Sequence, residues 1–485
     1  MARAEPKQRG EHRPRALAPQ SASERDGLKP TSSQSLSSGF AGDAASSLIA
    51  QIVGLTCGLA GLVIAARVLG PTGRGLLALV TLWISLFALA APLSSGYGLA
   101  FELREGRVHL TNALSSAAGL AAALGAVGAA LAVCVAWRCP FGFLDGVPLS
   151  YVIIGAAAIP AVIFNGLSGL ALTAAGRLRQ ASLIAMAGSL AALTLLALFL
   201  VVLGRGVAGA VLASSLASVI GTLITLTWFR SHVRAALIIQ PAVWASAVRF
   251  GLKLHGGMIA QWANYSLDRF LINVFLGPAA VGVYAVAATL GERLWMLPSA
   301  VGASLLSRTG GDACDDAELT ARACRNTFWL MAGACLMLGV AAPFVIPAIF
   351  GADFAAASTP LRILLPGVLL LSAGKTVVPY ITNHNRPWTG TWISLISMGS
   401  TLILNVLLIP RLGIAGSALA STIAYGANGV LHCLVFVRLS RVAPGRLLMV
   451  RATHLPPIPP GVPQESAANR RLHTAAATSS AGRER

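Results

Sequence analysis

The chain of 485 residues is 55% hydrophobic and only 11% charged, with a mean hydropathy of +0.73. This composition excludes a soluble protein, whose apolar and charged fractions would be far more even. The formal net charge of +19 would suit nucleic-acid binding, but the basic residues are confined to the two tails and to alternate loops. That distribution is typical of membrane proteins, in which basic residues in the loops on one side set the orientation of the chain, so we expect no nucleic-acid partner.

The first forty residues are rich in Arg, Pro, Ser and Gln and contain no apolar segment of the kind found in signal peptides. We therefore expect residues 1–40 to be a disordered basic tail and no cleaved signal. Residues 441–485, with the Pro-rich stretch 454–460 and further arginines, have the same character. Either tail is able to contact anionic membrane lipids, although a solvated tail explains the composition equally well.

Between the tails, twelve apolar segments are each long enough to cross a bilayer. Without water in the hydrocarbon they must be helices, so the sequence predicts an all-α integral membrane protein with about 12 transmembrane helices. The expected first lobe is 41–230 and the second is 254–440, joined by a cytoplasmic linker at 231–253. The expected spans are 44–67, 75–101, 110–137, 151–175, 181–203, 207–229, 254–276, 281–306, 326–350, 358–382, 388–410 and 413–437.

The second six segments repeat features of the first six at an offset of 207 residues. Leu69-Gly70-Pro71 recurs as Leu276-Gly277-Pro278, and Leu212-Ala213-Ser214 recurs as Leu419-Ala420-Ser421. Further matches at the same offset are Gly75 with Gly282, Ala78 with Ala285, and Ala208-Gly209 with Ala415-Gly416. Because each half has an even number of spans, the repeats are parallel, with a central cavity between two six-helix lobes.

Loops on the side of the termini carry most of the basic residues, which places both termini in the cytoplasm and the chain in the cell inner membrane. The outer helix ends are expected to hold the remaining arginines: Arg67, Arg74, Arg138, Arg205, Arg362 and Arg411.

The sequence contains no complete motif for catalysis or metal binding. Ala373-Gly374-Lys375-Thr376 resembles the end of a phosphate-binding loop but lies in an apolar span and has Leu369 where a glycine is required. The cysteines have no metal-ligand spacing, and Cys134 and Cys139 at an outer helix end are able to pair only in an oxidising environment. We expect no cofactor, no metal and no enzymatic activity.

Charged residues within the spans are confined to the second half. They are Asp268, Arg269, Glu292, Arg293 and Lys375, and Asn264 lies one helical turn before Asp268. A charge near the middle of the membrane costs about 2.5–3.5 kcal/mol even on the permissive insertion scale, so it must face a partner or a cavity.

Two interpretations of these charges stay open. In one, Asp268 pairs with Arg293 and Glu292 pairs with Arg269, locking two helices together. In the other, Arg269, Arg293 and Lys375 line a basic cavity for an anionic headgroup, because guanidinium groups donate paired hydrogen bonds to phosphate. The two are compatible if the pairs exchange between conformations.

The stretch from Ala66 to Gly75, with Leu69-Gly70-Pro71 at its centre, resembles the start of polysaccharide biosynthesis proteins of the oligosaccharidyl-lipid flippase type. The stretch from Leu267 to Ile272, leading into 276–285, is similar to the same family. This family belongs to the multidrug/oligosaccharidyl-lipid/polysaccharide exporter superfamily, and the resemblance covers about residues 40–440.

The resemblance implies a two-lobe, twelve-helix transporter that flips polyprenyl-pyrophosphate-linked glycans to the outer leaflet by alternating access. Basic residues line the cavity of such proteins, and Arg269, Arg293 and Lys375 are the candidates here. Glycosyltransferases and a polymerase of the same pathway are the implied partners.

Two alternative functions remain. A cation-coupled multidrug exporter of the same superfamily needs acidic groups in its cavity, whereas the charges here are mainly basic. A membrane glycan polymerase or ligase needs outer catalytic loops, and the outer loops of this chain are short.

Overall fold

A computed structural model describes residues 33–138, 142–232, 241–308, 313–384 and 387–448. Within these ranges every regular element is a helix. The elements are α1 (Ser33–Ala90), α2 (Ser95–Arg104), α3 (Leu110–Trp137), α4 (Leu149–Ala156), α5 (Ile159–Ala174), α6 (Leu178–Ala197), η2 (Leu198–Val202), α7 (Gly206–His232), α8 (Pro241–Leu276), α9 (Pro278–Arg293), α10 (Met296–Arg308), α11 (Ala313–Phe350), η3 (Ala352–Ala357), α12 (Ser358–Asn383), α13 (Pro387–Ser440) and α14 (Gly445–Leu448).

Each of the twelve expected apolar segments lies in one of these helices or in a consecutive pair, which confirms the all-α membrane fold. The helices α1 and α13 each contain two expected segments and reverse direction at a glycine. Gly70 in α1 has φ 63° and Gly413 in α13 has φ 61°, a conformation that costs glycine little. Among the described residues, eight helices are long and apolar enough to span a bilayer, as judged by length and composition alone.

Three expected segments are broken within the membrane. The second is interrupted after Ala90, where Leu93 and Ser94 adopt positive φ values of 51° and 56°. The fourth and eighth are interrupted between α4 and α5 and between α9 and α10. These breaks lie close to prolines in the sequence, because proline removes a backbone donor and clashes with the preceding turn.

Large apolar side chains cover the outside of the bundle. Phe344 is 76% exposed, Met337 71% and Leu336 70%, all on α11. An apolar surface of this extent is stable only in contact with lipid. The chain is therefore a multi-pass membrane protein.

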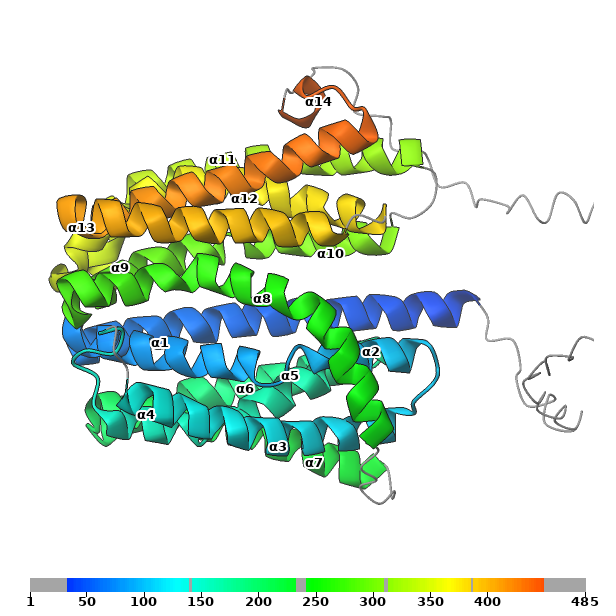
Figure 1. The fold of residues 1–485 in the computed structure, drawn as a ribbon, viewed down its shortest axis with the longest axis horizontal. Helices are drawn as coiled ribbons and strands as arrows, with labels where there is room; N and C mark the ends of the chain where they lie inside the picture. The colour runs from blue at the N-terminus through cyan, green and yellow to red at the C-terminus, as the bar shows by residue number, and fades with distance from the viewer. Residues whose placement is uncertain (1–32, 139–141, 233–240, 309–312, 385–386, 449–485) are drawn as a thin grey trace, which may run out of the picture.

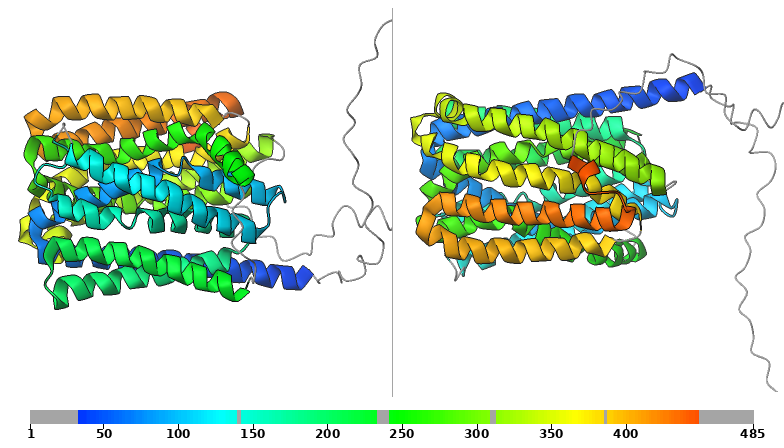
Figure 2. Two further views of the ribbon diagram at one scale, coloured as in Figure 1. Left: turned by 60° about the horizontal axis from the view of Figure 1, so that its bottom comes forward. Right: turned by 90° about the horizontal axis from the view of Figure 1, so that it is seen from above.

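The helices form two groups that follow the order of the sequence. In Figure 1, α1 to α7 occupy one half of the bundle and α9 to α13 the other, α8 runs from the first half into the second, and both described chain ends lie at the same end of the molecule. Figure 2 shows the start of α1, in blue, running beside the two teal-green helices α6 and α7 at one edge.

The two halves meet in a symmetric contact between α1 and α9. A side chain at Gly75 would overlap the carbonyl group of Pro278, and a side chain at Gly282 would overlap the carbonyl group of Pro71. Both pairs are related by the offset of 207, so equivalent positions of the two sequence repeats meet in this contact. It lies at the end of the bundle opposite the two chain ends.

A second contact closes the same end of the bundle. The guanidinium group of Arg67 donates to the carbonyl oxygens of Ala348 at 2.6 Å and Ile349 at 2.7 Å. These carbonyls belong to the last turn of α11, where unpaired acceptors and the helix dipole favour a cation. Arg67 thus ties the first half of the chain to the second.

The helix α8 belongs to both halves. Its first part packs against α2, where a side chain at Gly98 would overlap Ala247 and one at Gly251 would overlap the backbone of Leu93 and Ser94. Its last part packs against α13. Of the expected linker, 241–253 is therefore the start of α8, and 233–240 lies outside the described residues.

Prediction for the α1–α9 contact. Gly282→Ala should destabilise the protein by about 1–3 kcal/mol, because backbone atoms of Pro71 cannot move away from an added methyl group. The measurement is the thermal unfolding midpoint in detergent. Gly399→Ala is the matched control, since Gly399 lies in the helix α13 with open space at the Cβ position. Equal midpoints for the two variants would show that the α1–α9 contact does not contribute to the stable conformation.

Candidate functional site

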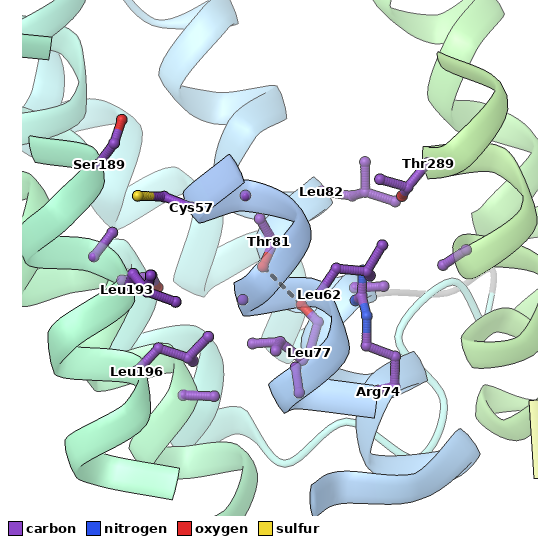
Figure 3. A pocket seen from close by; sticks show the side chains of 18 of the residues that line it. Cys57, Leu62, Arg74, Leu77, Thr81, Leu82, Ser189, Leu193, Leu196 and Thr289 are labelled. Atoms are coloured by element: carbon purple, nitrogen blue, oxygen red, sulfur yellow. Dashed lines mark hydrogen bonds between the residues drawn. The ribbon is translucent and has the colours of Figure 1, made fainter. Parts of the chain in front are cut away.

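A cavity of about 560 Å³ lies between the two halves, walled by α1, α6 and α7 on one side and by α8 and α9 on the other. Figure 3 shows Cys57 and Leu62 of α1, Ser189 and Leu193 of α6, and Thr289 of α9 around this space. We call it the arginine cavity, after its charged lining residues. Within the described lining these are Arg74, Arg269, Glu292 and Arg293.

Arg269 and Glu292 form an ion pair across the helices α8 and α9. The Arg269 side chain is 9% exposed, whereas that of Glu292 is 31% exposed. This pair was one of the two expected from the sequence. A single carboxylate thus compensates a buried guanidinium at the cavity wall.

Arg293 and Arg74 bring two further positive charges to the same cavity. The guanidinium of Arg293 lies against Gly58 of α1, where an added Cβ atom would be 2.8 Å from Nη2. Arg74 extends from the second part of α1 and lies within the electrostatic range of Arg269. Three arginines therefore face one glutamate among the described lining residues.

Two of these guanidinium groups have unused donors. The Nε atoms of Arg74 and Arg269 are buried and have no hydrogen-bond partner. An unsatisfied buried donor on a charged group costs more than about 1–3 kcal/mol, so the cavity is poorly satisfied without an acceptor. An anion with several oxygens would supply acceptors and balance the excess positive charge.

Asp268 points to a different part of the structure from its neighbour Arg269. Its carboxylate accepts hydrogen bonds from the hydroxyl groups of Tyr284 at 2.7 Å and Ser421 at 3.3 Å, and from the Arg269 amide at 2.8 Å. The expected pairing of Asp268 with Arg293 is not formed among the described contacts. The reason is that consecutive residues on a helix point roughly 100° apart, so only one of them faces the cavity.

The amide candidate Asn264 connects two helices of the second half. It is 1% exposed, and its side-chain oxygen accepts a hydrogen bond of 2.7 Å from Thr401 of α13. It is not among the described residues that line the arginine cavity.

Lys375 lies among aromatic rings. Its ammonium group is 5.3 Å from the ring centroid of Tyr265 and 5.1 Å from that of Trp295, and Tyr425 packs edge-on against both rings. A cation over aromatic faces is stabilised by about 0.5–2 kcal/mol. Lys375 is likewise absent from the described lining of the arginine cavity.

Arg74 is the residue of this cavity that the sequence analysis missed. It was counted among the arginines of the outer helix ends, because it follows the apparent loop at Gly70 and Pro71. The structure has no loop there: α1 turns at Gly70, and Arg74 lies a turn deeper in the returning helix. Two sequence features indicated that Arg74 lies close to a helix. Gly75 beside it begins an expected span, and Val281, which occupies the repeat position of Arg74, also begins one.

With the geometry described, comparison with known proteins identifies the family. Residues 40–306, more than half of the chain, match the family model described as "Polysaccharide biosynthesis protein". The chain belongs to this family. The match includes the arginine cavity and the α1–α9 contact, but stops before α11 to α13.

A relative supports the family assignment. The chain is 24% identical over 223 residues to the probable low-salt glycan biosynthesis flippase Agl15 of Haloferax volcanii, covering 44% of the chain and 46% of that protein. The chain thus matches about half the length of this family relative.

Solved structures show the same fold. The lipid II flippase MurJ in an inward closed conformation has a TM-score of 0.69 at 14% identity, over 82% of this chain and 87% of that one. A multidrug resistance MATE family transporter in an inward-facing conformation has a TM-score of 0.63 at 18% identity, over 80% and 98%. This chain and these structures therefore share an all-α membrane fold.

Prediction for the ion pair. Glu292→Gln should lower the free energy of unfolding by about 1–3 kcal/mol, because it leaves the buried Arg269 without its compensating charge. The double variant Arg269→Met with Glu292→Leu should lose less than the sum of the single variants. Chemical denaturation in detergent, analysed as a double-mutant cycle, measures this coupling. Strict additivity would show that the two side chains do not interact.

Proposed function

We propose that this protein flips a polyprenyl-(pyro)phosphate-linked oligosaccharide from the inner to the outer leaflet of the cytoplasmic membrane, for cell-surface polysaccharide biosynthesis. The observation that carries the proposal is the arginine cavity. It lies between the two halves, has an excess of positive charge in its described lining, and its residues Arg74 and Arg269 carry guanidinium donors without a partner. The family and the named flippase relative support the same substrate class.

The chemistry of the cavity suits a pyrophosphate group. Guanidinium groups donate parallel hydrogen bonds to phosphate oxygens, and they remain charged when buried. Arg269 and Arg293 from one half and Arg74 from the other would hold the anion between the two halves. The lipid tail stays in the bilayer while the headgroup crosses.

The way in which the two halves meet supports the proposal of alternating access. The α1–α9 contact and the Arg67 hydrogen bonds close the end opposite the chain ends. The cavity lining runs along α1 from Ala65 back to Gly54, away from that closed end. If both termini are cytoplasmic, as the basic loops predict, this conformation receives the headgroup from the cytoplasm.

A multidrug exporter is the second candidate, because a MATE family transporter has the same fold. Cationic drugs require acidic groups where they bind. The described lining of the arginine cavity offers one carboxylate, Glu292, and it is already paired with Arg269. The charge of the cavity therefore favours an anionic substrate.

Prediction for the arginines. Arg74→Ala, Arg269→Ala and Arg293→Ala should each weaken binding of polyprenyl pyrophosphate about tenfold or more, since a charge-assisted hydrogen bond contributes about 1.5–3 kcal/mol. Binding is measured with the lipid and purified protein in nanodiscs, and glycan export is measured in cells that depend on the variant.

Two control variants separate the cavity from other cations. Lys375→Met and Arg362→Ala should bind the lipid as the unchanged protein does, because neither residue lines the arginine cavity in the described structure. Normal binding and export by all three arginine variants would refute the proposed substrate class. Binding of cationic drugs in its place would support the exporter.

A further inference from the structure

A second cavity of about 410 Å³ lies within the first half, walled by α5, α6 and α7. It shares the lining residues Ser189, Ala192 and Ser214 with the arginine cavity, so the two spaces adjoin. Its volume lies within the range of about 300–1,000 Å³ typical of small-molecule sites. We call it the hydroxyl cavity. Its polar lining residues are Asn165, Ser168, Ser189, Ser214, Ser218 and Thr225.

The hydroxyl groups of this cavity have their protons engaged and their oxygens free to accept. Each donates to a backbone carbonyl three or four residues earlier in its own helix, at distances of 2.8 to 3.3 Å. A hydroxyl has two acceptor lone pairs besides its single donor. The wall therefore presents acceptors to any ligand that is rich in hydrogen-bond donors.

The wall is also held in place without a ligand. The side-chain amide of Asn165 donates to the carbonyl oxygen of Ser218 at 2.9 Å, and its oxygen accepts from Thr222 at 3.2 Å. These bonds fix α5 against α7. Gly169 and Gly188 face open space at their Cβ positions, so the volume is maintained by the absence of side chains.

The described lining of the hydroxyl cavity contains no Asp, Glu, Lys, Arg or His. A charged ligand group placed there would lose its hydration without gaining an opposite charge. A neutral sugar gains hydroxyl-to-hydroxyl hydrogen bonds along such a wall, and its apolar ring faces contact the alanine and leucine residues. The chemistry of this wall thus differs from that of the arginine cavity next to it.

From this arrangement we infer that the hydroxyl cavity is a subsite for the sugar residues attached directly to the phosphate, and that these sugars are neutral. The inference rests on the proposed function, because it takes the arginine cavity as the site of the phosphate groups. The headgroup then lies across both cavities, with the pyrophosphate between the two halves and the first sugars between α5, α6 and α7.

The test compares three lipids in binding assays with nanodisc-embedded protein. The probes are polyprenyl pyrophosphate alone, the same lipid with a neutral disaccharide, and the same lipid with a disaccharide containing a uronic acid. The neutral glycolipid should bind about tenfold more tightly than the bare lipid. The uronic acid glycolipid should show no such gain.

Filling the hydroxyl cavity should remove this gain and leave the phosphate site intact. Gly188→Leu and Gly169→Leu place side chains into the open volume, whereas Gly166→Leu adds the same side chain on α5 at an open position outside the described cavity lining. The first two variants should bind all three lipids equally, and the third should retain the preference. Ser218→Ala is a smaller change at a residue that lines only the hydroxyl cavity, and it should reduce the preference about threefold. It serves as the test if a leucine variant fails to fold.

The outcomes separate the two proposals. If Arg269→Ala weakens binding of every lipid but the unchanged protein shows no preference for the neutral glycolipid, the sugar subsite is refuted and the proposed function stands. Stronger binding of the uronic acid glycolipid overturns the assignment of neutral sugars. Unchanged binding of bare polyprenyl pyrophosphate in all three variants, Arg74→Ala, Arg269→Ala and Arg293→Ala, refutes the proposed function itself.

Discussion

The arrangement of the two halves depends on how closely the backbones of α1 and α9 approach each other. Only hydrogen atoms fit at positions 75 and 282, because the space of a side chain is occupied by the carbonyl groups of Pro278 and Pro71. The atoms that occupy this space belong to the backbone, so no substitution at another position removes them. Both positions therefore require glycine in this conformation. The contact also sets the depth at which Arg74, one residue before Gly75, meets the charges of α8 and α9.

The electrostatics of the arginine cavity follow from that approach. Arginines from both halves place three guanidinium groups around the carboxylate of Glu292. The described lining offers too few hydrogen-bond acceptors for these groups. Such a site is stable in a membrane only if the charge faces water or an anionic ligand. The neighbouring hydroxyl cavity has the opposite property, because its hydroxyl groups donate within their own helices and Asn165 bonds to α7. Two adjoining spaces with different chemistry suit a ligand with one charged and one neutral part.

The fold was predictable from the sequence, and the site was predictable in part. Long apolar segments specify membrane helices, and the matched glycines Gly70 and Gly277 specify the same backbone turn in both halves, with φ values of 63° and 81°. The pairing of Arg269 with Glu292 was among the alternatives. The direction in which Asp268 points was not predictable. Consecutive side chains on a helix point in different directions, and hydropathy does not indicate whether Asp268 or Arg269 faces the cavity. The aromatic rings around Lys375 come from α8, from α13 and from the turn between α9 and α10, so no local pattern reveals them.

The shared helix α8 has a mechanical consequence. Its first part is held to α2 by a hydrogen bond between Ser94 and His255, and by another from Ser246 to Glu102, while its last part packs against α13. The pair Gly256–Gly257 lies between these parts, and α8 is visibly bent in Figure 1. Any rotation of one half against the other must therefore change the curvature of this helix. In the proposed transport cycle, the stiffness of α8 would therefore contribute to the free-energy difference between the two conformations.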